Sequence, residues 1–138
     1  MNCGRHGEAE SFVQYFRPSR AANLASPIKK MPNNPDYVIV LTTLPADADG
    51  RALGRTLVDE RLAACVNLLP PMESVYRWEG QVEQDTERQM IIKTSKERVV
   101  ALWDRLRELH PYETPEFVVL TISDGSDAYL RWVGESTS

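Results

Sequence analysis

Segments with the pattern of β-strands and segments with the period of α-helices follow one another in an order that few architectures can accommodate. The strand-like segments are rich in β-branched and aromatic residues, and the helical ones repeat apolar residues every three or four positions. Their order is strand 37–43, helix 51–64, a hairpin of strands 65–78 and 82–94, helix 99–109, strand 117–122 and a short helix 128–133. Two split βαβ units in this order predict a ferredoxin-like α+β sandwich, an antiparallel sheet with two helices on one face, plus the short C-terminal helix.

Three local signals refine these elements. The continuous run of apolar and β-branched residues over 37–43 is typical of a central strand that is buried on both faces. Gly80 follows Glu79 between the two hairpin strands and predicts a turn with positive φ. Thr94 and Glu97 have the spacing of a capping box, which predicts that they open helix 99–109.

Charge and proline content divide the chain near residue 35. Residues 1–35 hold five Lys and Arg residues, two acidic residues and four of the nine prolines, whereas residues 36–138 hold eleven basic and eighteen acidic residues. We therefore expect a mobile N-terminal tail over 1–35 and one folded domain over 36–138. The alternative is that Met31 is the true start and the preceding residues come from an upstream start assignment.

Composition excludes several classes of protein. No apolar run approaches the roughly 20 residues that a transmembrane helix needs, and the net charge of -4 argues against general nucleic-acid binding. The two cysteines, Cys3 and Cys65, form no CxxC pair, and we interpret them as reduced thiols of a cytoplasmic protein, the alternative being a single disulfide bridge. No GxSxG, P-loop, HExxH or dinucleotide-binding glycine motif is present, so the sequence predicts that the protein is not an enzyme.

The predicted architecture leaves one face of the sheet without helices. A sheet with apolar residues on both faces cannot leave one of them in water. The fold therefore predicts self-association.

Five segments of the sequence, in order and with matching gaps, are similar to the CutA family: Cys65–Pro70, Ser74–Gly80, Met90–Thr94, His110–Glu116 and Ala128–Val133. The resemblance implies a homotrimer of ferredoxin-like subunits with a role in tolerance of, or response to, divalent metal ions, copper being the metal most often named. It also implies a less defined association with membrane or enzyme partners. Some members have a cysteine and a second histidine where this chain has Thr42 and Leu109.

His110 and Glu113 are the candidate metal ligands, for Cu(II) or another divalent cation. Imidazole is a preferred ligand of Cu(II), and carboxylates assist it. The alternative for His110 is a helix C-cap, because helix 99–109 ends there and an imidazolium stabilises that end of a helix.

A second candidate site is a cleft between subunits, formed by Trp78, Lys93, Tyr112 and Glu116 together with Glu113. By analogy with the trimeric PII signalling proteins, an anion or a small metabolite, or a protein partner, would bind there. This describes a non-catalytic signalling or scaffold module, the alternative to direct copper binding. For Lys93 the simpler interpretation is a side chain that reaches water past its apolar neighbours.

Acidic residues recur along the second hairpin strand at Glu83, Asp85 and Glu87, with Glu79 just before it. Their spacing places them on one strand face. Such a face is usually solvated and discourages aggregation, and the alternative is loose collection of hard cations through carboxylate oxygens.

Overall fold

The computed structural model describes residues 36–138, so the predicted tail over 1–35 lies outside the described residues. The elements are β1 (Tyr37–Pro45), α3 (Gly50–Asp59), β2 (Cys65–Trp78), β3 (Gln81–Ser95), the short 3-10 helix η1 (Lys96–Arg98), α4 (Val99–Leu109), β4 (Val118–Thr121) and α5 (Asp127–Ser136).

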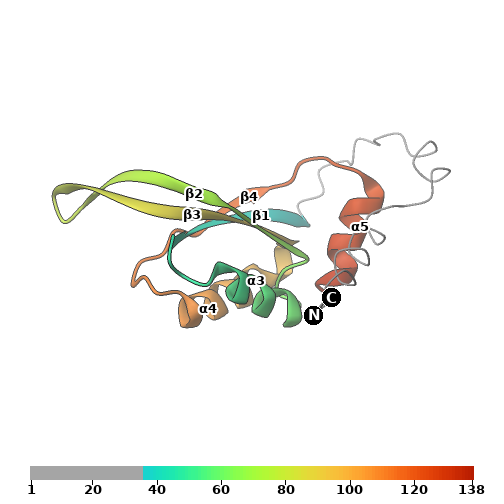
Figure 1. Cartoon of the computed structure of the whole chain (residues 1–138). Helices are drawn as coiled ribbons and strands as arrows, with labels where there is room; N and C mark the ends of the chain where they lie inside the picture. Colours follow the sequence, from blue (N-terminus) through green and yellow to red (C-terminus); the bar gives the residue numbers. More distant parts are fainter. Residues whose placement is uncertain (1–35) are drawn as a thin grey trace, which may run out of the picture.

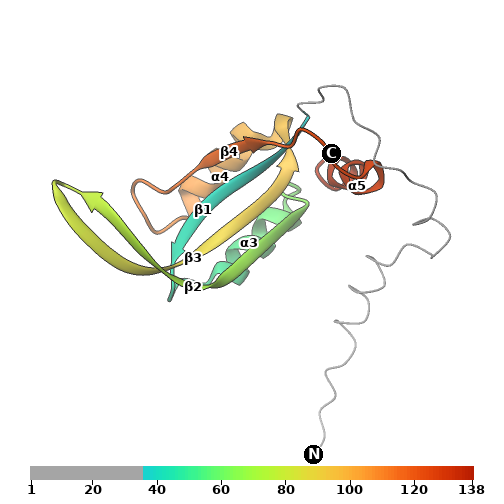
Figure 2. The same ribbon diagram turned by 90° about the horizontal axis from the view of Figure 1, so that it is seen from above.

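The four strands form one antiparallel sheet in the order β2-β3-β1-β4. Helices α3 and α4 lie side by side on the same face of this sheet (Figures 1 and 2). Each helix connects two strands that are not neighbours in the sheet, as in a split βαβ unit. The predicted ferredoxin-like α+β fold is confirmed.

The core lies between the sheet and the two helices, and only one face of β1 enters it. Burial alternates along β1, so that Val38 and Val40 are fully enclosed while Ile39 and Leu41 on the other face stay half-buried. The expectation that β1 is buried on both faces is therefore wrong for this chain by itself, because no helix of the described residues 36–138 covers the second face. The core consists of Val38, Val40, Leu44, Leu57, Leu62, Ala63, Met90, Ile92, Leu102 and Leu106.

Helix α3 begins and ends with specific caps. The Asp49 side chain accepts a hydrogen bond from the amide of Ala52 (3.0 Å) at its start. The helix ends at Asp59, five residues before the predicted end, because Arg61 turns into the left-handed region at φ 58°. The amides of Arg61 and Leu62 then bond the carbonyls of Val58 and Leu57, at 3.0 and 2.9 Å, which completes a Schellman motif.

The predicted capping box at Thr94 and Glu97 is wrong. Thr94 still belongs to β3, and its buried hydroxyl donates to the carbonyl of Leu62 at 2.8 Å. The chain enters α4 through η1, and the N-cap Ser95 forms no side-chain capping bond. The Thr94 hydroxyl is thus used to join β3 to the end of the α3 segment.

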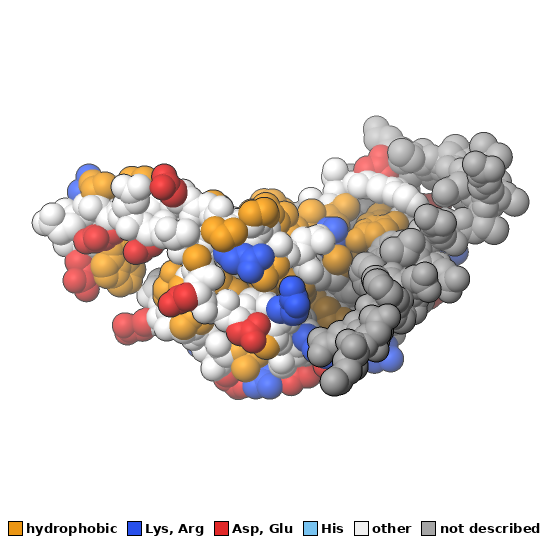
Figure 3. Space-filling model, viewed as in Figure 1, with side chains coloured by type: hydrophobic (Ala, Val, Ile, Leu, Met, Phe, Trp, Pro, Cys, Tyr) orange, Lys and Arg blue, Asp and Glu red, His pale blue; other side chains and the backbone are white. Residues whose placement is uncertain are grey.

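The β2–β3 hairpin extends well beyond the two helices and leaves the body of the molecule as an arm (Figure 1). Its turn has the predicted geometry, with Gly80 at φ 80° and Glu79 also positive at 47°. Hydrophobic and acidic side chains lie together on the arm (Figure 3), and Val75 and Val82 are 66% and 64% exposed.

Helix α5 lies beyond the end of the sheet, next to the start of β1 and the end of β3 (Figures 1 and 2). Ser126 caps it, and near its other end the buried Thr137 hydroxyl bonds that of Ser95 at 3.0 Å. Within residues 36–138 no helix is both long and apolar enough to cross a membrane.

Candidate binding pocket

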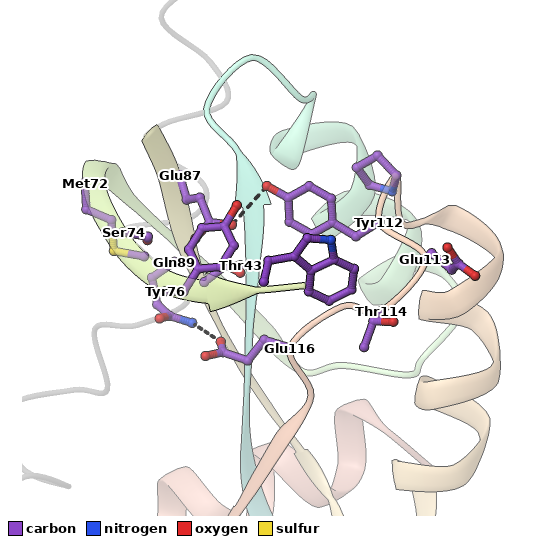
Figure 4. A pocket seen from close by; sticks show the side chains of 12 residues that line it. Thr43, Met72, Ser74, Tyr76, Glu87, Gln89, Tyr112, Glu113, Thr114 and Glu116 are labelled. Atoms are coloured by element: carbon purple, nitrogen blue, oxygen red, sulfur yellow. Dashed lines mark hydrogen bonds between the residues drawn. The ribbon is translucent and has the colours of Figure 1, made fainter. Parts of the chain in front are cut away.

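A pocket of about 610 Å³ opens where the hairpin arm leaves the sheet. One wall comes from β1, β2 and β3, and the other from the 110–117 loop that connects α4 to β4 (Figure 4). The lining residues are Thr43, Met72, Ser74, Tyr76, Trp78, Glu87, Gln89, Pro111, Tyr112, Glu113, Thr114 and Glu116.

A β-bulge in β2 decides which of its side chains face this pocket. Leu68 pairs with Met90, but Pro71 pairs with Arg88, so β2 contains one residue more than β3 between these two pairs. After the bulge the even-numbered residues of β2 share a face with Glu87 and Gln89. Prolines suit this position because they lack the N–H that a regular ladder would use.

His110 fixes the start of the 110–117 loop. Its Nε2 donates to the Thr43 carbonyl at 2.7 Å, and its Nδ1 accepts the amide of Tyr112 at 3.0 Å. A carbonyl can only accept and an amide N–H can only donate, so the ring is neutral with its proton on Nε2. Burial lowers the pKa of His110, and the Thr43 carbonyl and the nearby Glu87 carboxylate oppose this effect.

Two hydrogen bonds hold the pocket walls together, and both are drawn in Figure 4. The Tyr112 hydroxyl donates to Oε1 of Glu87 at 2.9 Å, and Nε2 of Gln89 donates to Oε2 of Glu116 at 3.0 Å. Gln89 also donates to the Thr42 carbonyl at 2.8 Å. The loop is therefore attached to β1 and β3 at several points.

The pocket is acidic. Glu87, Glu113 and Glu116 line it, and among residues 36–138 no lysine, arginine or histidine does so. The Tyr76 hydroxyl donates to Asp85, and this bond, together with burial and the charges of nearby carboxylates, raises the pKa of Tyr76 to about 12. Burial and the bond to Glu87 also raise the pKa of Tyr112. Nearby carboxylates contribute to both shifts, and burial is the first cause for Tyr112.

The predicted metal ligands lie at different depths. His110 is buried, with both ring nitrogens in hydrogen bonds, while Glu113 is exposed at the pocket edge. Within residues 36–138 no group of three or more His, Cys, Asp and Glu side chains is arranged to hold a metal ion. Thr42 faces the helix-covered core, and its buried hydroxyl finds no hydrogen-bond partner among the described residues. The assignment of His110 and Glu113 as metal ligands remains a prediction.

The structure brings together four of the five residues predicted for the cleft. Trp78, Tyr112, Glu113 and Glu116 line the pocket, but Lys93 does not. Lys93 lies further along β3, with its Nζ 2.9 Å from Oδ1 of Asn67 and 5.8 Å from the centre of the Tyr129 ring.

Tyr76, Glu87 and Gln89 also line the pocket, and the sequence does not predict this. Glu87 in particular belongs to the acidic series expected on a solvated strand face, yet it is only 8% exposed. Strand alternation places it on one face with Glu83 and Asp85. It does not reveal that Glu87, unlike the exposed Glu83 and Asp85, is buried and bonded to the 110–117 loop.

Comparison with known proteins identifies the family. The family model described as CutA1 divalent ion tolerance protein matches residues 38–136. Divalent-cation tolerance protein CutA of Pectobacterium atrosepticum is 46% identical over 101 residues, which are 73% of this chain and 92% of that protein. Protein CutA, chloroplastic, of Arabidopsis thaliana is 43% identical over 100 residues, 72% of this chain and 55% of that protein.

A solved structure of similar fold supports the same assignment. It is described as the divalent cation tolerance protein (Cut A1) from Thermus thermophilus, and it superposes with a TM-score of 0.72 at 42% identity. The alignment covers 74% of this chain and 99% of that one. The resemblance recognised in the five sequence segments is confirmed, and the chain belongs to the CutA1 divalent ion tolerance family.

Proposed function

We propose that this chain serves divalent-cation tolerance as a homotrimeric, non-catalytic binding module, and that its binding site is the pocket between the hairpin arm and the 110–117 loop. The observation that carries the proposal is the pocket itself. Its walls come from separate parts of the chain and are held by specific hydrogen bonds, Tyr112 to Glu87 and Gln89 to Glu116. In this proposal the response to metal ions is indirect.

The open face of the sheet supports self-association. Ile39 pairs with Leu120 and Leu41 pairs with both Ile91 and Val118, which places an apolar patch opposite the helices. Leu120 and Val118 are 46% and 42% exposed. Exposed apolar side chains on an uncovered sheet face mark an interface.

Sedimentation of the full chain tests the assembly. We expect three times the mass of one chain, and we expect Ile91→Glu to lower it by placing a charge on the open face. Val100→Glu is the matched control, since Val100 is a 72% exposed residue of α4 and the charge change is the same. An unchanged mass for Ile91→Glu, or a single-chain mass for the unmodified protein, would contradict the trimer proposal.

Direct binding of Cu(II) by His110 and Glu113 is the second candidate. It is favoured by the presence of an imidazole and an exposed carboxylate on one loop, three positions apart. Binding would require the imidazole to give up its bond to Thr43 or to the amide of Tyr112, and this requirement favours the indirect proposal.

A calorimetric Cu(II) titration of the full chain separates the two candidates. Direct coordination predicts saturable binding at a fixed ratio per subunit that His110→Gln and Glu113→Gln each abolish. The indirect proposal predicts that neither substitution changes the heat of titration. His110→Gln is preferred to alanine because the glutamine amide can still donate to the Thr43 carbonyl.

The compartment and the absence of catalysis stay predictions. The cytoplasm is inferred from reduced cysteines, and the Arabidopsis relative is named chloroplastic. The non-catalytic role is supported by the sequence, which lacks the common motifs of nucleophilic, metal-dependent and dinucleotide-dependent enzymes.

A further inference from the structure

We propose that a second copy of this chain completes the pocket, and that Lys93 of the neighbouring subunit enters it and pairs with Glu87. The inference rests on the proposed function, because it needs the trimer, and it names the residue that a neighbour contributes to the site. Each subunit would give its lysine to one neighbour and receive a lysine from the other.

The symmetry of a trimer requires two different patches on every chain. A ring of three subunits has no twofold axis between neighbours, so each interface joins one patch of a subunit to a different patch of the next. The sheet offers two such regions. The arm and the pocket lie at one end of it, and α5 lies at the other end (Figures 1 and 2).

Lys93 supplies the positive charge of the patch near α5. Side chains alternate along β3, so Lys93 shares the open face with Glu87, whereas Arg88 belongs to the helix-covered face. Arg77 of β2 pairs with an even-numbered residue of β3 and therefore shares the face of Arg88. Lys93 is thus the one lysine or arginine that the described strands place on the open face.

Glu87 is the matching carboxylate in the pocket. It is 8% exposed, and the one hydrogen bond that its side chain accepts within residues 36–138 comes from the Tyr112 hydroxyl at 2.9 Å. None of the ion pairs in the described part of the chain includes it. A subunit that packs on this face removes still more water from Glu87, so the carboxylate then needs a positive charge beside it.

Lys93 cannot supply that charge within its own chain. The two residues are six positions apart on β3, which is about 20 Å at roughly 3.3 Å per residue. The Nζ atom of Lys93 lies instead 2.9 Å from Oδ1 of Asn67 and 5.8 Å from the centre of the Tyr129 ring. A pair formed across the interface satisfies both charges with one contact, and it also fixes which patch meets which.

A double-mutant cycle on trimer dissociation tests the pair. Lys93→Met and Glu87→Gln each remove one charge with little change of shape. Each should raise the dissociation constant of the trimer by at least about tenfold, because the other charge is left buried without a partner. The double variant should lose no more than the weaker of the two single variants. The measurement is sedimentation of the full chain over a series of urea concentrations, extrapolated to water.

Two matched controls come from η1, outside the sheet. Lys96→Met and Glu97→Gln remove the same charges from exposed residues and should leave the dissociation constant unchanged. Circular dichroism shows whether each variant is folded. If Glu87→Gln does not fold, carbodiimide cross-linking of the unmodified protein decides the question, since this reagent joins an amine to a carboxylate that it touches. In trimers assembled from isotopically light and heavy chains, we expect a link from Lys93 of one chain to Glu87 of another.

The results separate this inference from the proposed function. Losses that multiply in the double variant, or a Lys93→Met trimer as tight as the controls, would overturn the pair and leave the proposed trimer intact. A cross-link from Lys93 to a carboxylate outside the pocket, or none at all, would overturn it as well. A single-chain mass for the unmodified protein would instead contradict the trimer itself.

Discussion

The Nε2 proton of His110 is donated to the carbonyl of Thr43, 2.7 Å away, and this bond joins the end of α4 to the end of β1. The amide of Tyr112 occupies the other ring nitrogen. One imidazole thereby connects the helix layer, the sheet and the pocket loop, and it can do so only while it is neutral.

Stability is therefore expected to decrease as the pH falls below the ordinary His pKa of 6.5. Burial lowers the pKa of His110 in the folded chain, so below 6.5 the unfolded chain binds more protons and unfolding is favoured. Thermal melting between about pH 8 and pH 5 should show this loss, and His110→Gln should reduce its slope. Identical slopes for the two proteins would show that other groups cause the pH dependence.

Tyr112→Phe removes the hydroxyl that bonds the buried Glu87 carboxylate. Hydrogen bonds to charged groups contribute about 1.5–3 kcal/mol, so the free energy of unfolding in urea should decrease by about that amount. Tyr76→Phe is the control within the same pocket, because it removes the bond of a more exposed hydroxyl to Asp85 and should have a smaller effect. Equal losses would mean that Glu87 is solvated.

Thr42→Val should stabilise the protein by about 1 kcal/mol, because it replaces a buried hydroxyl that lacks a partner among the described residues with a methyl group of similar size. Thr94→Val is the opposite case. Its buried hydroxyl donates to the Leu62 carbonyl, and the same substitution should decrease stability by about 1–3 kcal/mol. The sign of the two changes is the test, and a loss at both positions would show that the Thr42 hydroxyl is satisfied.

Arg61→Gly should increase the free energy of unfolding by about 0.5–1 kcal/mol, since φ is 58° at Arg61 and the left-handed region is strained for residues other than glycine. Arg61→Ala retains the strain and should give no gain. Urea denaturation of the two variants isolates the backbone effect from the loss of the arginine side chain. A gain for alanine as large as that for glycine would assign it to the side chain.

Most of the fold could be predicted from the sequence, because the spacing of hydrophobic residues indicates which segments form strands and which form helices. The continuous apolar and β-branched run in 37–43 and the helical spacing in 99–109 correspond to β1 and α4, and the order of elements then leaves few topologies. The errors occur at the ends of elements. Arg61 ends α3 by a Schellman motif that local propensity does not favour for arginine, and Thr94 bonds Leu62, 32 positions away in the chain, instead of capping the next helix.

The pocket could be predicted only in part. The cleft predicted by analogy with the PII proteins groups Trp78, Tyr112 and Glu116, and the structure places all three on one cavity. Lys93 belongs to the same predicted group, but the position of a residue along a strand does not show how far the covering loop reaches. The burial of Glu87 depends on that loop, so it cannot be predicted from the alternation of side chains along the strand.

Strand β2 has one extra residue between Leu68 and Pro71. The number of residues in this stretch therefore decides which side chains of the arm face the pocket. Because side chains alternate along a strand, deleting one residue there would restore regular pairing and turn Met72, Ser74, Tyr76 and Trp78 away from the pocket, with Glu73, Val75 and Arg77 in their place. Substitutions in this stretch can be tolerated individually, whereas a change in its number of residues would exchange an aromatic wall for a charged one. This part of the chain is therefore expected to tolerate point mutations better than insertions or deletions.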